Sequence, residues 1–143
     1  MIVDDVGLAV LDEAECLDLL GRASVGRVAV SIGAVPAVFP VNYGILDGMI
    51  VFRTGTGTKL DAATRNAVIA FEVDEVDLTY HEGWSVLAVG IAGVLHDPVQ
   101  IERALALPLA SWAPGHRDHV VCLAPEFVSG RRIVHEGPGP ASA

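Results

Sequence analysis

The chain has 143 residues, enough for one domain whose core can fold without disulfides or metals. Its formal net charge of −9 argues against nucleic acid and against an anionic membrane surface as partners. Hydrophobic residues make up 52% and charged residues 19%, so we expect part of the apolar excess to lie in a subunit interface. No apolar run is long enough to span a bilayer, and the acidic N-terminus is not a secretory signal. Cys16 and Cys122 match no metal or redox spacing, which predicts a cytoplasmic protein with two buried, reduced thiols.

The first half of the chain predicts a helix followed by three antiparallel strands. Asp12 can cap a helix that runs to Gly21, since acidic residues suit the positive helix end; residues 1–11 form a leader without assigned structure. Hydrophobic alternation predicts three strands joined by hairpins, over residues 26–32, 35–43 and 49–53. Pro36 and Pro40 donate no backbone hydrogen bond, so the second strand should be an edge, bulged or ligand-facing there.

The second half predicts an alternation of helices, strands and loops. In chain order these are a short helix, a strand, an acidic loop, a long strand, a helix, a loop and a last strand, over residues 59–66, 67–73, 74–83, 84–95, 97–107, 108–118 and 119–128. Gly90 and Gly93 allow the long strand to bend as a sheet closes. Residues 137–143 are expected to be disordered, which leaves 1–136 as one domain. Hairpin-length connections favour a mainly β fold, a small antiparallel barrel with peripheral helices.

One loop of the chain has the composition of an anion site. Lys59 is the only lysine, and only threonine and glycine separate it from Arg53. Glycine lets backbone N–H groups turn towards a ligand, threonine hydroxyls donate, and both cations suit phosphate. A helix starting at Lys59 would add its positive N-terminal end. The loop therefore predicts a phosphate site, with a plain connecting loop as the alternative; Leu60 breaks both the Walker A and the Rossmann patterns.

Five segments in this order resemble the flavin-binding split β-barrel of the pyridoxamine 5′-phosphate oxidase-like superfamily, and its small actinobacterial members in particular. The segments that carry the resemblance are residues 25–31, 40–43, 51–60, 68–74 and 83–90. The resemblance spans roughly residues 12–133. It implies FMN-binding homodimers with two flavin sites at the interface, and an oxidoreductase acting on a small-molecule substrate.

The resemblance also implies which residues contact the cofactor. They are Arg53, Thr54, Thr58 and Lys59 at the phosphate, Pro40, Val41 and Asn42 beside the flavin ring, and Trp84 and Ser85 approaching the flavin across the subunit boundary. The C-terminal Arg and Trp pattern that holds substrate in pyridoxamine phosphate oxidase itself has no counterpart, which argues against vitamin B6 oxidation. Three alternatives stay open on this fold: a deazaflavin-dependent reductase, disfavoured by the few basic residues, a flavin carrier without turnover, and a cofactor-free structural dimer.

The remaining polar residues give no catalytic assignment, because a flavin supplies its own redox chemistry. The five histidines have no metal-site spacing and are expected on the surface or in loops; they are His81, His96, His116, His119 and His135. Asp74, Glu75 and Asp77 predict a solvated acidic loop. Trp112 is expected to be a packing residue, and Tyr43 either lines the flavin pocket or fills the core.

Overall fold

The computed structural model describes residues 1–109 and 118–133. Within them, nine strands form one sheet in the order β1-β2-β9-β7-β6-β3-β4-β5-β8, and every neighbouring pair is antiparallel. The strands are β1 (Ile2–Val3), β2 (Ala9–Leu11), β3 (Val25–Ile32), β4 (Val35–Leu46), β5 (Met49–Gly55), β6 (Ala67–Asp77), β7 (Glu82–Val94), β8 (Asp118–Leu123) and β9 (Phe127–Arg132). The helices are α1 (Glu13–Leu20), α2 (Lys59–Ala63) and α3 (Pro98–Leu105).

A further pairing between β7 and β8 closes part of this sheet into a barrel. The barrel consists of the six strands β7, β6, β3, β4, β5 and β8. At the bend of β7, a Cβ on Gly90 would lie 2.4 Å from the carbonyl oxygen of Ala124, so only glycine fits this close approach. A Cβ on Gly93 would meet nothing within 4 Å. The small antiparallel split barrel with peripheral helices that the sequence predicts is confirmed.

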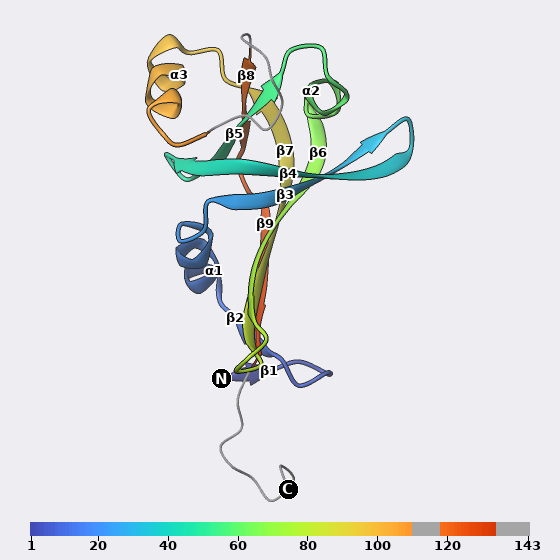
Figure 1. The fold of residues 1–143 in the computed structure, drawn as a ribbon, viewed down its shortest axis with the longest axis vertical. Coiled ribbons are helices and arrows are strands. Elements are labelled where there is room, and N and C mark those ends of the chain that lie inside the picture. Colours follow the sequence, from blue (N-terminus) through green and yellow to red (C-terminus); the bar gives the residue numbers. More distant parts are fainter. Residues whose placement is uncertain (110–117, 134–143) are drawn as a thin grey trace, which may run out of the picture.

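The barrel forms one end of the molecule, and a narrower stem forms the other (Figure 1). The strands β6, β7 and β9 run along the stem, and β3 and β4 cross them as a long hairpin that projects to one side. The helices α2 and α3 lie at the barrel end, while β1, β2 and the N-terminus lie at the far end of the stem. None of the helices in the described residues has both the length and the apolar composition needed to cross a membrane.

Alternate residues of the barrel strands point inward and form the core, and α1 packs against β9 and β7 and adds Cys16, Leu19 and Leu20 to that core. Tyr43 belongs to this core: its ring meets Phe71 edge-on at 4.8 Å, and its hydroxyl donates to the carbonyl of Leu20. Burial raises the pKa of Tyr43 to about 12. Of the two positions that the sequence leaves open for Tyr43, the structure selects the core. A capping box between Asp12 and Glu15 starts α1 where the sequence predicts a helix.

The predicted acidic loop over residues 74–83 is wrong. The strand β6 runs to Asp77 and β7 begins at Glu82, so only a short turn separates them. Asp74 is half-buried on the strand and lies 2.8 Å from the Arg27 guanidinium. The acidic residues at the end of β6 resembled a loop in the sequence, because Arg27, which pairs with two of the carboxylates, comes from a neighbouring strand that is far away in sequence.

The predicted single last strand over residues 119–128 is also wrong. The chain leaves β8 at Leu123 and enters β9 at Phe127. Both strands run antiparallel to β7, so the residues between them interrupt a single run beside β7; on their other sides β8 pairs with β5 and β9 with β2. The predicted leader forms β1 and β2, and α2 ends at Ala63, earlier than predicted. Trp112, His116, His135 and the tail over residues 137–143 lie outside the described residues.

Candidate functional site

The Thr/Gly loop between β5 and α2 is held together by its own hydrogen bonds. Thr58 caps α2: its Oγ1 accepts from the backbone N–H of Asp61 at 3.1 Å and donates to the carbonyl of Gly55 at 2.8 Å. Gly57 has φ +80°, a conformation that favours glycine. The sequence-predicted loop therefore has a defined shape before any ligand binds.

A buried carboxylate, Asp61, organises this end of the barrel. Asp61 is 2% exposed and accepts hydrogen bonds from Thr54 Oγ1 at 2.9 Å, Gly57 N–H at 3.1 Å, His119 Nδ1 at 2.7 Å and Arg65 Nη2 at 3.4 Å. Burial by itself would raise the pKa of Asp61, but the bonds from His119, Gly57 and Thr54 outweigh it and hold that pKa below its ordinary value. We call these five residues the Asp61 cluster.

Sequence reasoning missed the Asp61 cluster, although one local signal was present. Thr58 and Asp61 have the spacing of a helix-capping pair, which places Asp61 at the first turn of α2. No local pattern points to His119, which is 58 residues away in sequence. His119 lies at the start of the last strand, as predicted, but its side chain is half-buried against Asp61 instead of being a plain surface residue.

The four predicted phosphate residues are brought to one end of the barrel, but in different roles. The hydroxyls of Thr54 and Thr58 already donate to Asp61 and to Gly55. Arg53 neighbours Thr54 on β5, so their side chains point to opposite faces of that strand. Lys59 is the exposed first residue of α2. Lys59 is thus exposed at the loop, whereas the two threonines are used in hydrogen bonds that shape it.

The segment predicted to lie beside a flavin ring forms the middle of β4. Pro40, Val41 and Asn42 pair with residues of β3. Val41 is buried in the barrel core, so Pro40 and Asn42 are the side chains on the outer side of the strand. Only these two could contact a ligand outside the barrel through their side chains.

Trp84 and Ser85 lie far from the loop within one chain. Trp84 is in register with Arg132, which in turn pairs with Ala9 of β2, at the stem end in Figure 1. The stretch of β7 between Ser85 and Val94, where β8 joins, spans roughly 30 Å at the usual rise of a strand. A cavity of about 340 Å³ includes Trp84 and Ser85 in its lining. The structure therefore separates the predicted flavin residues into two groups.

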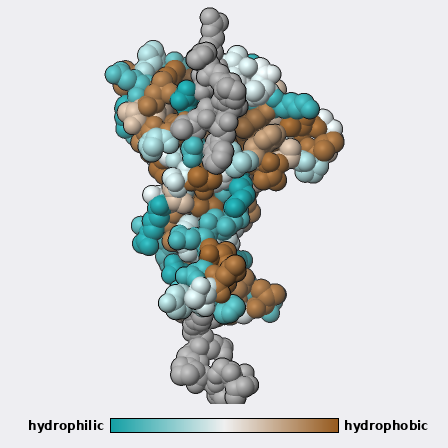
Figure 2. All heavy atoms as spheres, in the orientation of Figure 1, coloured by the Kyte–Doolittle hydropathy of each residue, from teal (hydrophilic) through white to brown (hydrophobic). Residues whose placement is uncertain are grey.

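An apolar sheet face, which we call the outer face, lies between these two groups. It is the side of β4, β3, β6, β7 and β9 that points away from the barrel core. One row across it is in register and almost wholly apolar: Val38, Ala29, Ala70, Val89 and Phe127. A second apolar pair, Val68 and Ile91, lies beside this row, and Val68 is 67% exposed. Figure 2 shows hydrophobic residues gathered on the projecting β3–β4 hairpin.

A charged group interrupts the apolar outer face. The Arg27 guanidinium lies 3.2 Å from Glu72 and 2.8 Å from Asp74, both on β6. Burial, together with the neighbouring Asp74 carboxylate, raises the pKa of Glu72 to about 7, even though Arg27 acts in the other direction. The outer face thus carries carboxyl groups that share one cation.

Fold and site together define a member of the split β-barrel proteins. Residues 12–132 match the family model described as pyridoxamine 5′-phosphate oxidase, and the chain belongs to this family. The predicted resemblance is confirmed. An uncharacterized protein of Mycobacterium tuberculosis is 37% identical over 135 residues, which cover 91% of this chain and 88% of that protein.

Two solved structures show the same architecture. The FAD binding protein of Mycobacterium smegmatis is 32% identical with a TM-score of 0.76, over 88% of this chain and 100% of that one. A FAD-binding protein of Mesorhizobium loti is 26% identical with a TM-score of 0.73, over 89% of this chain and 99% of that one.

Proposed function

We propose that this chain binds a flavin nucleotide at the interface of a homodimer and acts there as an oxidoreductase on a small molecule. One observation carries the proposal: the two groups of predicted flavin residues lie at opposite ends of one chain, on either side of an exposed apolar sheet face. A single chain cannot bring both groups to one flavin mononucleotide. Two copies can, if the loop of one meets Trp84 and Ser85 of the other.

The outer face supports a second copy of this chain as its occupant. Exposed apolar patches of this kind usually mark an interface. A two-fold arrangement lets the same patch serve both partners, so no additional surface is required. Because Pro40 and Asn42 lie at the same side of β4 as Val38, a flavin ring beside them would sit at the rim of that interface.

The donors at the loop fit a flavin phosphate. Lys59 supplies an exposed ammonium at the start of α2, where the loop ends. Arg53 supplies a second cation near the end of β5, where the loop begins. FMN and FAD share this phosphate. FMN requires only the phosphate contacts that the loop offers. The names of the two structural relatives favour FAD. A deazaflavin cofactor is the alternative on the same fold.

Redox chemistry in this proposal belongs to the flavin when it is bound. The chain's own contribution is to hold the phosphate with Lys59 and Arg53, to flank the ring with Pro40 and Asn42, and to keep water away with the apolar interface. No acid or base of the chain is required for electron transfer itself, which agrees with the absence of an assigned catalytic residue in the sequence.

The test is a spectroscopic titration of the purified protein with FMN, FAD and the deazaflavin cofactor. We expect saturable flavin binding that Lys59→Ala weakens about tenfold or more, since a charge-assisted contact to phosphate is lost. The matched control is Arg22→Ala, which removes one exposed cation paired with Asp18 on α1, far from the loop. Its flavin affinity should equal that of the wild type.

Each other outcome selects an alternative. Equal affinity of the wild type and Lys59→Ala would remove the loop from the site. Tight binding of the deazaflavin alone would change the cofactor and keep the fold. Bound flavin that NADH and NADPH cannot reduce would favour a carrier without turnover, and no binding of any cofactor would favour a structural dimer.

A further inference from the structure

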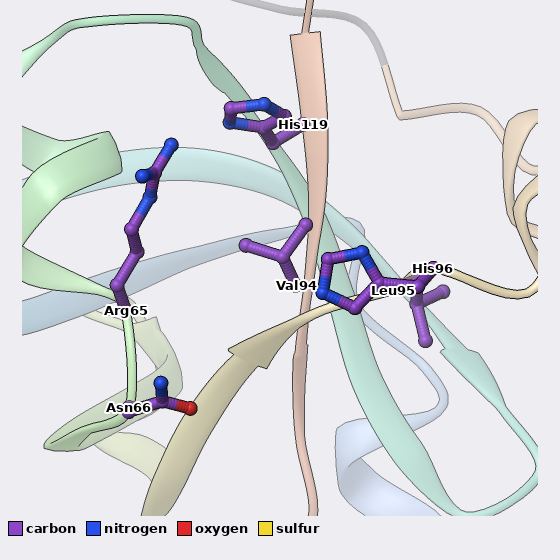
Figure 3. Close-up of a pocket in the computed structure, with 6 residues that line it drawn as sticks. All are labelled: Arg65, Asn66, Val94, Leu95, His96 and His119. Atoms are coloured by element: carbon purple, nitrogen blue, oxygen red, sulfur yellow. The ribbon is translucent and has the colours of Figure 1, made fainter.

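A second polar site lies beside the Asp61 cluster, at the end of α2 away from Lys59. It is a cavity of about 350 Å³ between the residues after α2, the end of β7 and the start of β8. The residues that line it are Arg65, Asn66, Val94, Leu95, His96 and His119 (Figure 3). Apart from two apolar residues, every lining side chain can donate a hydrogen bond.

The orientation of the His119 ring is fixed by a hydrogen bond to Asp61 on the side away from the cavity. Its Nδ1 lies 2.7 Å from Oδ1 of the buried Asp61, so Nδ1 carries a proton and donates it to that carboxylate. The other ring nitrogen, Nε2, is then the polar atom that His119 can offer to the cavity. A buried carboxylate behind a histidine that faces a cavity holds the ring in one tautomer and one direction.

Arg65 extends the same arrangement. One of its terminal nitrogens is 3.4 Å from Oδ2 of Asp61, which leaves its other N–H donors for the cavity. In Figure 3 the Arg65 guanidinium and the His119 ring lie near one another on one side of the cavity, and the His96 ring lies on the other. Three nitrogen-bearing side chains that can be cationic therefore surround one space.

The carboxylate of Asp61 does not itself face the cavity as an acceptor. Both of its oxygens are already engaged by hydrogen bonds from Thr54, Gly57, Arg65 and His119, and the carboxylate is buried beneath these donors. Val94 and Leu95 form an apolar wall, and a less polar surrounding strengthens each charged contact.

We propose that this cavity is a second anion site, which takes a phosphate group through Arg65, His96 and His119. The phosphate could belong to a separate small ligand or to the part of FAD that lies beyond its flavin phosphate. The site rests on the geometry of α2, β7 and β8, and it stands whether or not the chain binds a flavin at the loop.

The test is a titration of the flavin-free, full-length protein with inorganic phosphate at constant ionic strength, followed by NMR of the histidine rings. We expect saturable shifts of the His119 and His96 resonances, assigned through the corresponding His→Asn variants. His119→Asn keeps a donor for Asp61, and His96→Asn does not touch Asp61 at all, so at least one folded variant is available. Each should weaken phosphate binding about tenfold, as for loss of a charge-assisted hydrogen bond.

The matched control is His81→Asn. His81 is exposed in the β6–β7 turn with φ +52°, a conformation that asparagine accepts. This variant should bind phosphate like the wild type. Linear, non-saturating shifts at His119 and His96, or equal affinity in all three variants, would overturn the proposal.

Two further arms identify the source of the phosphate and separate this proposal from the flavin site. If FAD displaces inorganic phosphate and FMN does not, the site binds the outer phosphate of FAD. If phosphate still binds after saturation with either flavin, the site serves a separate ligand. A Lys59→Ala variant that has lost flavin but keeps the His119 shifts would show that the two sites bind independently, whereas a Lys59→Ala variant with wild-type flavin affinity would contradict the loop assignment alone.

Discussion

Two carboxyl groups, Asp61 at the barrel end and Glu72 on the outer face, show how differently one chain can treat a partly buried acid. Asp61 is the more deeply buried, yet its pKa is lowered, because four donors meet it. Glu72 is more exposed, yet its pKa is raised to about 7, because partial burial and the neighbouring Asp74 carboxylate outweigh the Arg27 guanidinium that the two acids share. The number of donors, and not burial alone, decides the direction.

The comparison also indicates what each region is built for. The Asp61 cluster is satisfied within one chain and fixes the shape of the loop and the direction of His119. The outer face combines a row of apolar residues with two carboxyl groups, Glu72 and Asp74, that share a single arginine. Such a surface can bury apolar area against a partner, and its carboxyl groups can change protonation state with pH. The first region has its hydrogen bonds satisfied within one chain, and the second is the surface that we propose a second copy covers.

The largest expected effect is on stability at the Asp61 cluster. Asp61→Ala leaves the buried donors of Thr54 and Gly57 without an acceptor, so the free energy of unfolding should fall by about 3 kcal/mol. Urea unfolding measures this loss. The control is Asp18→Ala on α1, whose partner Arg22 is exposed, and it should change stability little. Equal losses in the two variants would mean that the cluster contributes nothing beyond a surface ion pair.

The next effect is on association through the outer face. Val68→Asp puts a charge into the apolar patch on both copies of a two-fold dimer, so we expect dissociation to a monomer at concentrations where the wild type is dimeric. Sedimentation velocity measures the mass directly. Val99→Asp is the matched control, because Val99 is 63% exposed, close to the 67% of Val68, but lies on α3 away from the outer face. A Val68→Asp dimer would place the interface elsewhere.

The smallest effect is a pH dependence carried by Glu72. In the folded chain Glu72 keeps its proton up to about pH 7, whereas in the unfolded chain it loses the proton near its ordinary value of 4.5. Between these values the folded state binds more protons, so this group lowers the free energy of unfolding as the pH rises. Glu72→Gln should remove that decline, measured by urea unfolding from pH 4.5 to 8. An identical slope in wild type and variant would show that Glu72 is ionised throughout.

Much of the fold was predictable because its signals are local. Alternation of apolar residues located β3, β4 and β5, and Asp12 and Asp97 marked the starts of two helices through their capping geometry. The part of the β6–β7 hairpin next to its turn was predicted as a loop, because its acidic residues look solvated in the sequence. The pairing of Asp74 with Arg27 of β3 cannot be seen there. The break between β8 and β9 lies where Ala124 closely approaches Gly90 of β7, a contact between distant segments that a single sequence does not show.

The candidate site divides in the same way. Lys59, Thr58 and the glycines could be read from composition, because a phosphate-type loop needs those residues next to one another. The contact of His119 with Asp61 could not, because it joins residues brought together only by the pairing of β5 with β8. The spacing from Thr58 could have predicted that Asp61 lies in the first turn of α2. It could not have predicted that Asp61 accepts the hydrogen bonds of the whole cluster.

The most direct test of a flavin site shared between two copies is a mixing experiment. Lys59→Ala damages the loop, and Ser85→Glu damages the opposite end of the chain, so each variant alone should retain little flavin at concentrations near the wild-type Kd. In a mixed dimer, one of the two sites combines the intact loop of one chain with the intact Ser85 of the other. After subunit exchange at equal concentrations, about a quarter of the wild-type flavin content should return, since half of the dimers are mixed and each has one intact site. No recovery of flavin in a mixture shown to contain mixed dimers would contradict the shared site.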